Sequence, residues 1–208
     1  VNYSTNNWTN IDAQHYFSTN CQTYVPDDNF EAYLEANGMG NGIANDDSVT
    51  TSNIVGITSL DVSSKAISDL TGIEDFASLS SLYCNDNQLT SLNVSNNTAL
   101  TDLSCYQNSL TSLDVSNNTA LTTLDCQINQ LTSLDLSQNT ALTVLSGKTN
   151  QLTSLDLSQN TALTFLGCSY NSLTNLDVSN NTALTNLYCY FNQLTNLDVS
   201  ANTALTEL

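Results

Sequence analysis

A 21-residue unit repeats in register through most of this chain, and it constrains the architecture more than any single residue does. One copy runs from Asn108 to Ile128 and reads NSLTSLDVSNNTALTTLDCQI. Further copies begin at Asn87, Asn129, Asn150, Asn171 and Asn192. A chain of this kind folds by stacking one coil on the next, so that each repeat contacts mainly its neighbours.

The first half of each coil carries the alternation of a half-buried strand. Leu103 and Cys105 are two residues apart and should point inward, whereas Asp102 and Ser104 should point outward. Asn108 then turns the chain, and its amide is suited to satisfying backbone groups inside the corner. We therefore predict a stacked asparagine ladder, whose members include Asn108, Asn129, Asn150 and Asn171.

The second half of each coil repeats this pattern and predicts a second strand on the opposite face. Leu113 and Val115 alternate with Asp114, and Asn118 marks the next corner. The second predicted ladder consists of Asn97, Asn118, Asn139, Asn160, Asn181 and Asn202. Each coil has too few residues for an additional helix. We therefore expect an all-β-dominated solenoid with two short parallel sheets.

The region before the repeats differs in composition and divides into two parts. Residues 1–25 are polar and irregular, and residues 26–56 are expected to form a helix-plus-loop cap over the first coil. Within that cap, Pro26 and Gly38 flank a short helix signal with Phe30 and Leu34 on one face. The solenoid is assigned to residues 57–208. It stops within a repeat and without a C-terminal cap, so we expect further domains of the same polypeptide.

The segment Leu100–Leu110 fits the pattern L-x-x-L-x-L-x-x-N-x-L, with cysteine in the third apolar position. In this the chain resembles the leucine-rich repeat family, over residues 57–208. The 22-residue first coil is internalin-like, and the leader with cysteine-bearing repeats is similar to secreted proteins of the Bacteroidetes type. The resemblance implies a right-handed coil and a secreted or cell-surface bacterial module for protein binding or cell adhesion, with no catalysis of its own.

The charge balance excludes several classes of partner. The net charge is −18, there is no arginine, and the two cations are Lys65 and Lys148. Nothing is present to neutralise phosphates, so we expect no nucleic-acid binding. No apolar run approaches the roughly 18 residues of a membrane span, so we expect no membrane insertion.

Five cysteines occupy one inward position of the repeat, and Gly147 fills the same position in a sixth copy. The five are Cys84, Cys105, Cys126, Cys168 and Cys189. A fixed inward position makes each thiol a small buried apolar group, so we predict reduced structural cysteines rather than disulfides. With His15 as the only histidine and no Cys-x-x-Cys motif, the sequence predicts no metal centre and no cofactor.

The two outward faces differ in how much they vary between copies. The face opposite the cysteines repeats serine and aspartate with little change, as a scaffold would. The cysteine-strand face varies and gathers aromatic side chains, which suit a recognition surface. Its candidate ligand-binding residues are Tyr106, Phe165, Tyr170, Tyr188, Tyr190 and Phe191. The partner could be a protein or a carbohydrate.

The invariant face carries a column of carboxylates: Asp114, Asp135, Asp156, Asp177 and Asp198. Neighbouring coils lie about 4.8 Å apart, so like charges should raise the pKa values of these aspartates. A file of divalent cations would relieve that repulsion. Hydrogen bonds from nearby serine hydroxyls or backbone N–H groups offer the alternative, and we favour them. The acidic loop 38–47 has the composition of a calcium loop but not its ligand spacing.

Three functional interpretations remain from the sequence. The first is a non-catalytic extracellular recognition or adhesion module that uses the cysteine-strand face. The second is a structural spacer within a larger exported protein. The third is an ice-binding solenoid, because threonines such as Thr90, Thr111 and Thr132 stack in columns. The third is disfavoured because that face alternates serine with aspartate. We expect no enzyme activity, because no unlike acid–base pair is recognisable.

Overall fold

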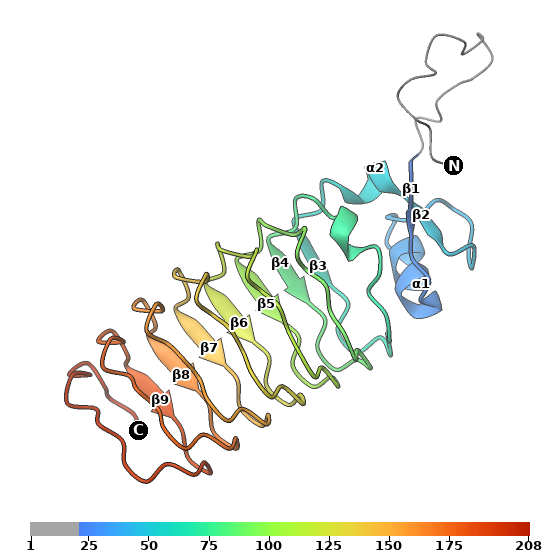
Figure 1. Ribbon diagram of the computed structural model, residues 1–208. Coiled ribbons are helices and arrows are strands. Elements are labelled where there is room, and N and C mark those ends of the chain that lie inside the picture. The colour runs from blue at the N-terminus through green and yellow to red at the C-terminus, as the bar shows by residue number, and fades with distance from the viewer. Residues whose placement is uncertain (1–20) are drawn as a thin grey trace, which may run out of the picture.

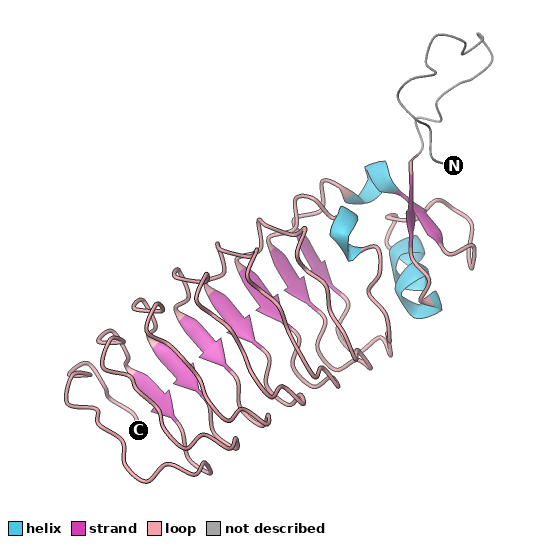
Figure 2. Ribbon diagram, in the orientation of Figure 1, coloured by secondary structure: helices cyan, strands magenta, loops and turns pink. Residues whose placement is uncertain are grey.

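A computed structural model of the chain describes residues 21–208. Most of the predicted irregular segment 1–25, together with His15, lies outside the described residues. The described part forms an elongated row of coils with a small cap at one end (Figure 1). Figure 2 shows that helix is confined to the cap end and that loops connect the strands of the row.

Seven short parallel strands build the main sheet in chain order. They are β3 (Ser59–Asp61), β4 (Ser81–Tyr83), β5 (Asp102–Ser104), β6 (Thr123–Asp125), β7 (Val144–Ser146), β8 (Phe165–Gly167) and β9 (Asn186–Tyr188). Leu60 pairs with Leu82 and Leu82 with Leu103, so that the first coil has 22 residues and the next 21. The predicted solenoid with its parallel sheet is confirmed.

The central residue of each strand points into the coil and supplies the core. Leu103, Leu124 and Leu145 are buried, as are the cysteines two positions after the first two of them. All six cysteines are free thiols. Burial raises the pKa of Cys84, Cys126 and Cys168 to about 12, so these thiols stay protonated and pack as apolar groups.

The first corner of each coil is held by an asparagine amide, as predicted. The Asn129 side-chain nitrogen donates to the carbonyl of Cys105 in the preceding coil at 3.0 Å and to Cys126 in its own coil at 3.1 Å. Its oxygen accepts the Leu110 N–H at 3.0 Å. The same pattern recurs from Asn108 to Asn171. Each amide therefore ties two coils together with bonds in both directions.

A second buried asparagine ladder holds the opposite corner. The Asn118 side-chain nitrogen donates to the carbonyls of Val94 and Asn97 in the preceding coil, both at 2.9 Å. In contrast to the first ladder, the side-chain oxygens accept no hydrogen bond from the protein. The predicted ladder is present, and its members are Asn97, Asn118, Asn139, Asn160, Asn181 and Asn202.

The predicted second parallel sheet is not formed. On the opposite face of the described coils, the only ladder contact is an isolated parallel bridge between Asn93 and Asp114. The run between the two corners is short, and the chain turns at its end within its own coil: the Asp114 carboxylate accepts the backbone N–H of Ser116, and Asn118 N–H donates to the Val115 carbonyl. Too few residues remain between the corners for a continuous ladder.

The cap is more regular than the sequence indicated. Strand β1 (Gln22–Tyr24) lies within the segment expected to be irregular and pairs antiparallel with β2 (Ser48–Thr50). Helix α1 (Asp28–Ala36) forms in the expected segment and buries Phe30 and Leu34. Short helical turns follow at α2 (Thr51–Ile54) and η2 (Ile73–Asp75).

Asp27 fastens the cap to the first coil. One of its carboxylate oxygens accepts the N–H groups of Asn29 and Phe30, which caps the N-terminus of α1. The other oxygen accepts the N–H and hydroxyl of Ser68, both at 2.8 Å. These bonds lower the pKa of Asp27 although its burial acts in the opposite direction. The cap and the solenoid thus share one carboxylate.

The asparagine ladder should carry a large share of the solenoid's stability. We expect Asn129→Ala to lower the free energy of unfolding by about 1–3 kcal/mol, because the Leu110 N–H and the Cys105 carbonyl lose their partner in a buried corner. Urea unfolding followed by circular dichroism measures the change. Gln138→Ala, at an exposed corner position, is the matched control, and equal losses in the two variants would contradict a structural role for the ladder.

Candidate recognition surface

Two outward surfaces of the solenoid are considered as candidate sites. The sheet face consists of the outward residues of β4–β9 and of the two residues that precede each Asn108-type corner. The Asp face consists of the exposed serine, threonine, asparagine and aspartate residues on the opposite side, including Asp114 and its equivalents. The fold imposes the same 21-residue spacing on both surfaces.

One position on the sheet face has an unusual backbone. The residue just before each ladder asparagine adopts a left-handed conformation, with φ between 53° and 56° at Gln107, Ile128, Thr149, Tyr170 and Phe191. Glycine or asparagine fits this region easily, whereas β-branched and bulky residues are strained there. Isoleucine, threonine, tyrosine and phenylalanine are poor choices if folding were the only requirement. Backbone strain of this kind is characteristic of functional positions.

Three aromatic rings gather at this corner in the coils of β8 and β9. The rings of Tyr170 and Phe191 stack with centroids 4.5 Å apart. The Tyr190 ring meets both of them edge-on, at 5.5 Å and 5.7 Å. All three side chains remain exposed, from 44% for Tyr170 to 68% for Phe191. An ordered aromatic cluster is thus held in solvent rather than in the core.

Phe165 and Tyr188 extend the cluster along the strands. Their ring centroids lie 5.6 Å apart. Gly167 makes room for this pair, because a Cβ atom at that position would lie 3.3 Å from the Phe165 ring. The Tyr188 hydroxyl donates to the carboxylate of Glu207. Five predicted residues therefore lie in two adjacent coils, as a cluster of three rings and a pair of rings. We call Phe165, Tyr170, Tyr188, Tyr190 and Phe191 the aromatic shelf.

Tyr106, the sixth candidate, does not join the aromatic shelf. It is half-buried just after β5, whereas the shelf lies in the coils of β8 and β9. A hydrogen bond to Asp86 raises the pKa of the Tyr106 hydroxyl, with smaller contributions from burial and from the nearby carboxylates. Tyr106 therefore belongs to an acidic part of the same face.

Sequence reasoning missed three residues that shape the shelf: Lys148, Gly167 and Glu207. The Lys148 ammonium group lies over the Tyr170 ring, 5.5 Å from its centroid. A signal for this contact was available, because Lys148 precedes Tyr170 by about one coil and therefore faces it across neighbouring coils. The contributions of Gly167 and Glu207 depend on the side-chain positions of Phe165 and Tyr188, which the spacing does not determine.

The aspartates of the Asp face are partnered, and the expected rise in their pKa is wrong. The Asp135 carboxylate accepts the backbone N–H of Ser137 at 2.9 Å, and the same bond recurs at Asp114, Asp156, Asp177 and Asp198. Hydrogen bonds from these serines lower the pKa of every aspartate in the column. Repulsion from neighbouring aspartates acts in the opposite direction but is weaker.

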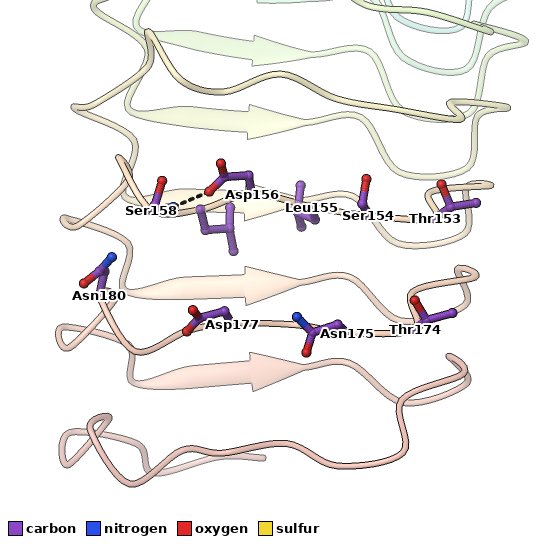
Figure 3. A pocket seen from close by; sticks show the side chains of 10 residues that line it. Thr153, Ser154, Leu155, Asp156, Ser158, Thr174, Asn175, Asp177 and Asn180 are labelled. Atoms are coloured by element: carbon purple, nitrogen blue, oxygen red, sulfur yellow. Dashed lines mark hydrogen bonds between the residues drawn. The ribbon is translucent and has the colours of Figure 1, made fainter.

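Shallow furrows of about 290 Å³ and 210 Å³ also lie on the Asp face. Figure 3 shows the larger one, with Ser154, Asp156 and Ser158 on one coil and Asn175 and Asp177 on the next. These hollows lie away from the aromatic shelf. They follow from the fold, because neighbouring coils on this side lack a continuous hydrogen-bond ladder and nearly the same residues recur in each copy. We therefore place the candidate site on the sheet face.

One acidic cluster lies in the cap. The carboxylates of Asp28, Glu31 and Asp47 approach within 4.8 Å of one another. Glu31 is buried, and its two oxygens accept the backbone N–H groups of Asp46 and Asp47 at 3.1 Å and 3.2 Å. Its evident role is to fasten the loop 38–47 to α1. Among residues 21–208, no helix has the length and apolar character needed to cross a membrane.

Comparison with known proteins supports the repeat assignment. No protein-family model matches the chain. Internalin J of Listeria monocytogenes serotype 4b is 44% identical over 75 residues, which cover 36% of this chain and 8% of that protein. The crystal structure of internalin C2 from the same species has a TM-score of 0.79 at 25% identity, and the match covers 89% of this chain and 87% of that one.

A plant protein shows the same fold. The leucine-rich repeat ectodomain of the receptor kinase GASSHO1/SCHENGEN3 from Arabidopsis thaliana, solved in complex with CASPARIAN STRIP INTEGRITY FACTOR 2, has a TM-score of 0.61 at 26% identity. The match covers 72% of this chain and 19% of that ectodomain. The predicted internalin-like leucine-rich repeat solenoid is confirmed by these similarities.

The bonding of the Asp face predicts the sign of its pH dependence. A carboxylate whose pKa is lower in the folded state stabilises that state above its unfolded pKa, and this stabilisation is lost as the pH falls through the folded pKa. We therefore expect Asp135→Asn to melt at a lower temperature than the parent at about pH 7, with the difference closing towards about pH 3. Differential scanning calorimetry tests this. A variant more stable than the parent at neutral pH would show that repulsion within the column dominates.

Proposed function

We propose that this chain is a non-catalytic recognition module that binds a protein partner through the aromatic shelf of its sheet face. The observation that carries the proposal is the residue choice at the left-handed corner. Tyr170 and Phe191 occupy strained backbone positions and expose large rings that the core does not use. Rigid aromatic side chains lose little conformational entropy on binding, so they are efficient anchors.

The contrast between the two faces supports the same surface. Both faces repeat at the spacing that the coil requires, yet the Asp face keeps nearly the same residues from Ser112 to Asp198. The sheet face changes in every coil. A structural spacer would have no use for this variation, nor for a gathered set of exposed rings.

Structural similarity is consistent with a protein ligand. The plant leucine-rich repeat ectodomain was solved in complex with a partner, and we propose the same general use here. A parallel sheet of short strands gives a stiff platform whose side chains are held in register, which keeps the entropy cost of binding low. We also propose that the module acts at the cell surface or outside the cell, with β1 and residues 26–56 as its cap and residues 57–208 as its solenoid.

The absence of catalysis is likewise a proposal. Within the described residues, the carboxylates of the Asp face are exposed and share one environment, so they do not form the unlike acid–base pair that most carboxylate chemistry needs. The buried cysteines have strongly raised pKa values and are poor nucleophiles. Recognition explains the surface without requiring a reaction.

Paired substitutions test the proposal. Tyr170→Ala combined with Tyr190→Ala should reduce affinity for a captured protein ligand at least tenfold, since the loss of even one aromatic hot-spot residue costs about 2 kcal/mol. Surface plasmon resonance with ligands recovered by pull-down provides the measurement, and the melting temperature verifies folding. Ser133→Ala with Ser154→Ala on the Asp face is the matched control and should leave affinity unchanged.

The outcomes separate the alternatives. Loss of binding in the serine pair but not in the tyrosine pair would assign the working surface to the Asp face. If neither a protein array nor a glycan array yields a ligand for the parent chain, the spacer interpretation replaces the proposal.

A further inference from the structure

Both cations of this chain are already placed over aromatic rings. Lys148 lies over Tyr170 at 5.5 Å, and Lys65 lies over Tyr33 at 5.7 Å. The sequence contains no other lysine and no arginine. Both lysine side chains of the sequence therefore lie over the face of a tyrosine ring.

Further ring surface remains on the aromatic shelf. Tyr190 is 49% exposed and Phe191 is 68% exposed. Within the described residues, neither ring has a lysine over it. Ring faces carry partial negative charge and attract ammonium and guanidinium groups. Both ring faces are therefore open to a cationic group of a ligand.

One carboxylate lies beside the shelf, and others lie further along the same face. Glu207 lies beside it and accepts hydrogen bonds from the Tyr188 hydroxyl and the Asn186 amide. These bonds lower the pKa of Glu207 and keep it ionised at neutral pH. Asp102 and Asp125 extend the acidic surface towards the cap, and the whole chain carries a net charge of −18.

A buried hydroxyl gives an independent indication of a ligand. Ser169 lies in the same column as Lys148 and Tyr190, whose side chains point outward, but it is only 1% exposed. Its oxygen has no hydrogen-bond partner in the protein. Ser169 directly precedes Tyr170 of the shelf, so a ligand N–H donor that reached its oxygen would satisfy an otherwise costly unpaired buried group.

We infer that the partner of the aromatic shelf is a basic polypeptide segment whose arginine or lysine side chains stack on Tyr190 and Phe191 beside Glu207. This inference rests on the proposed function and specifies the chemistry of its ligand. Opposite charge would accelerate the encounter, and the rings would supply the geometric selectivity. A neutral carbohydrate would stack on the rings but would gain nothing from the surrounding charge.

Three labelled synthetic peptides of equal length serve as probes, with arginine, glutamine or glutamate at the same alternating positions. Fluorescence anisotropy should show the arginine peptide binding at least tenfold more tightly than the glutamine peptide, and the glutamate peptide not binding. Affinity for the arginine peptide should fall as salt is raised, because exposed charges are screened.

Shelf variants separate a specific contact from general attraction. Phe191→Leu keeps an apolar side chain but removes the ring. It should lower the affinity for the arginine peptide about two- to fivefold. Ser169→Ala should also lower the affinity for the arginine peptide, whereas the melting temperature of the protein should stay unchanged or rise. Asp135→Asn removes a charge from the Asp face and is the control that should have no effect on affinity.

Two results would overturn the inference: equal affinity for the arginine and glutamine peptides, or equal losses in Phe191→Leu and Asp135→Asn. Its failure remains distinguishable from failure of the proposed function. A neutral sugar or an acidic protein that needs Tyr170 and Tyr190 would refute the basic partner while retaining the shelf as the binding surface. Retention of every ligand by the tyrosine variants would refute both.

Discussion

A buried asparagine amide that bonds two successive coils is the interaction on which this structure depends. Asn129 satisfies backbone groups of its own coil and of the one before it. At the opposite corner, the Asn139 side-chain nitrogen donates to the carbonyls of Val115 and Asn118, both in the preceding coil. Because a coil of 21 residues has no internal helix or long strand, its corners would otherwise bury unpaired carbonyl and N–H groups. The ladders therefore fix the spacing, and the leucine core follows.

Because the asparagine ladders and the leucine core hold the coils together, the outward side chains can vary within limits set by the backbone. On the Asp face, each aspartate is used locally, since it accepts an N–H group two residues later. On the sheet face, no such requirement acts, and the residues diverge. The left-handed corner is the exception, because its backbone disfavours the very side chains found there. The cost of Ile128 or Phe191 in that conformation is the physical reason to attribute a contact function to the surface.

Much of this fold could be predicted from the sequence because its determinants are local and repeated. Leu103, Cys105 and Asn108 recur in register, and their roles were predictable from alternation and from the need to satisfy a corner. The second sheet was mispredicted because the chain turns within its own coil directly after Val115 and leaves too short a run for a ladder, which hydrophobic alternation does not reveal. The pairing of β1 with β2 joins residues far apart in sequence. Five of the six candidate aromatics lie in two adjacent coils, and the contact of Lys148 with Tyr170 could have been inferred from their spacing. The contributions of Glu207 and Ser169 required side-chain positions.

The central claim is that the bulky residues at the left-handed corner serve contact with a ligand, although the backbone conformation there disfavours them. The thermal stability of Ile128→Asn tests it most directly, because Ile128 is exposed, has φ of 53° and lies outside the aromatic shelf. Asparagine tolerates this conformation, so the variant should be more stable than the parent by on the order of 1 kcal/mol. Thr132→Asn, an exposed substitution at a position without the left-handed backbone, should change the stability little. A loss of stability in Ile128→Asn would contradict the account.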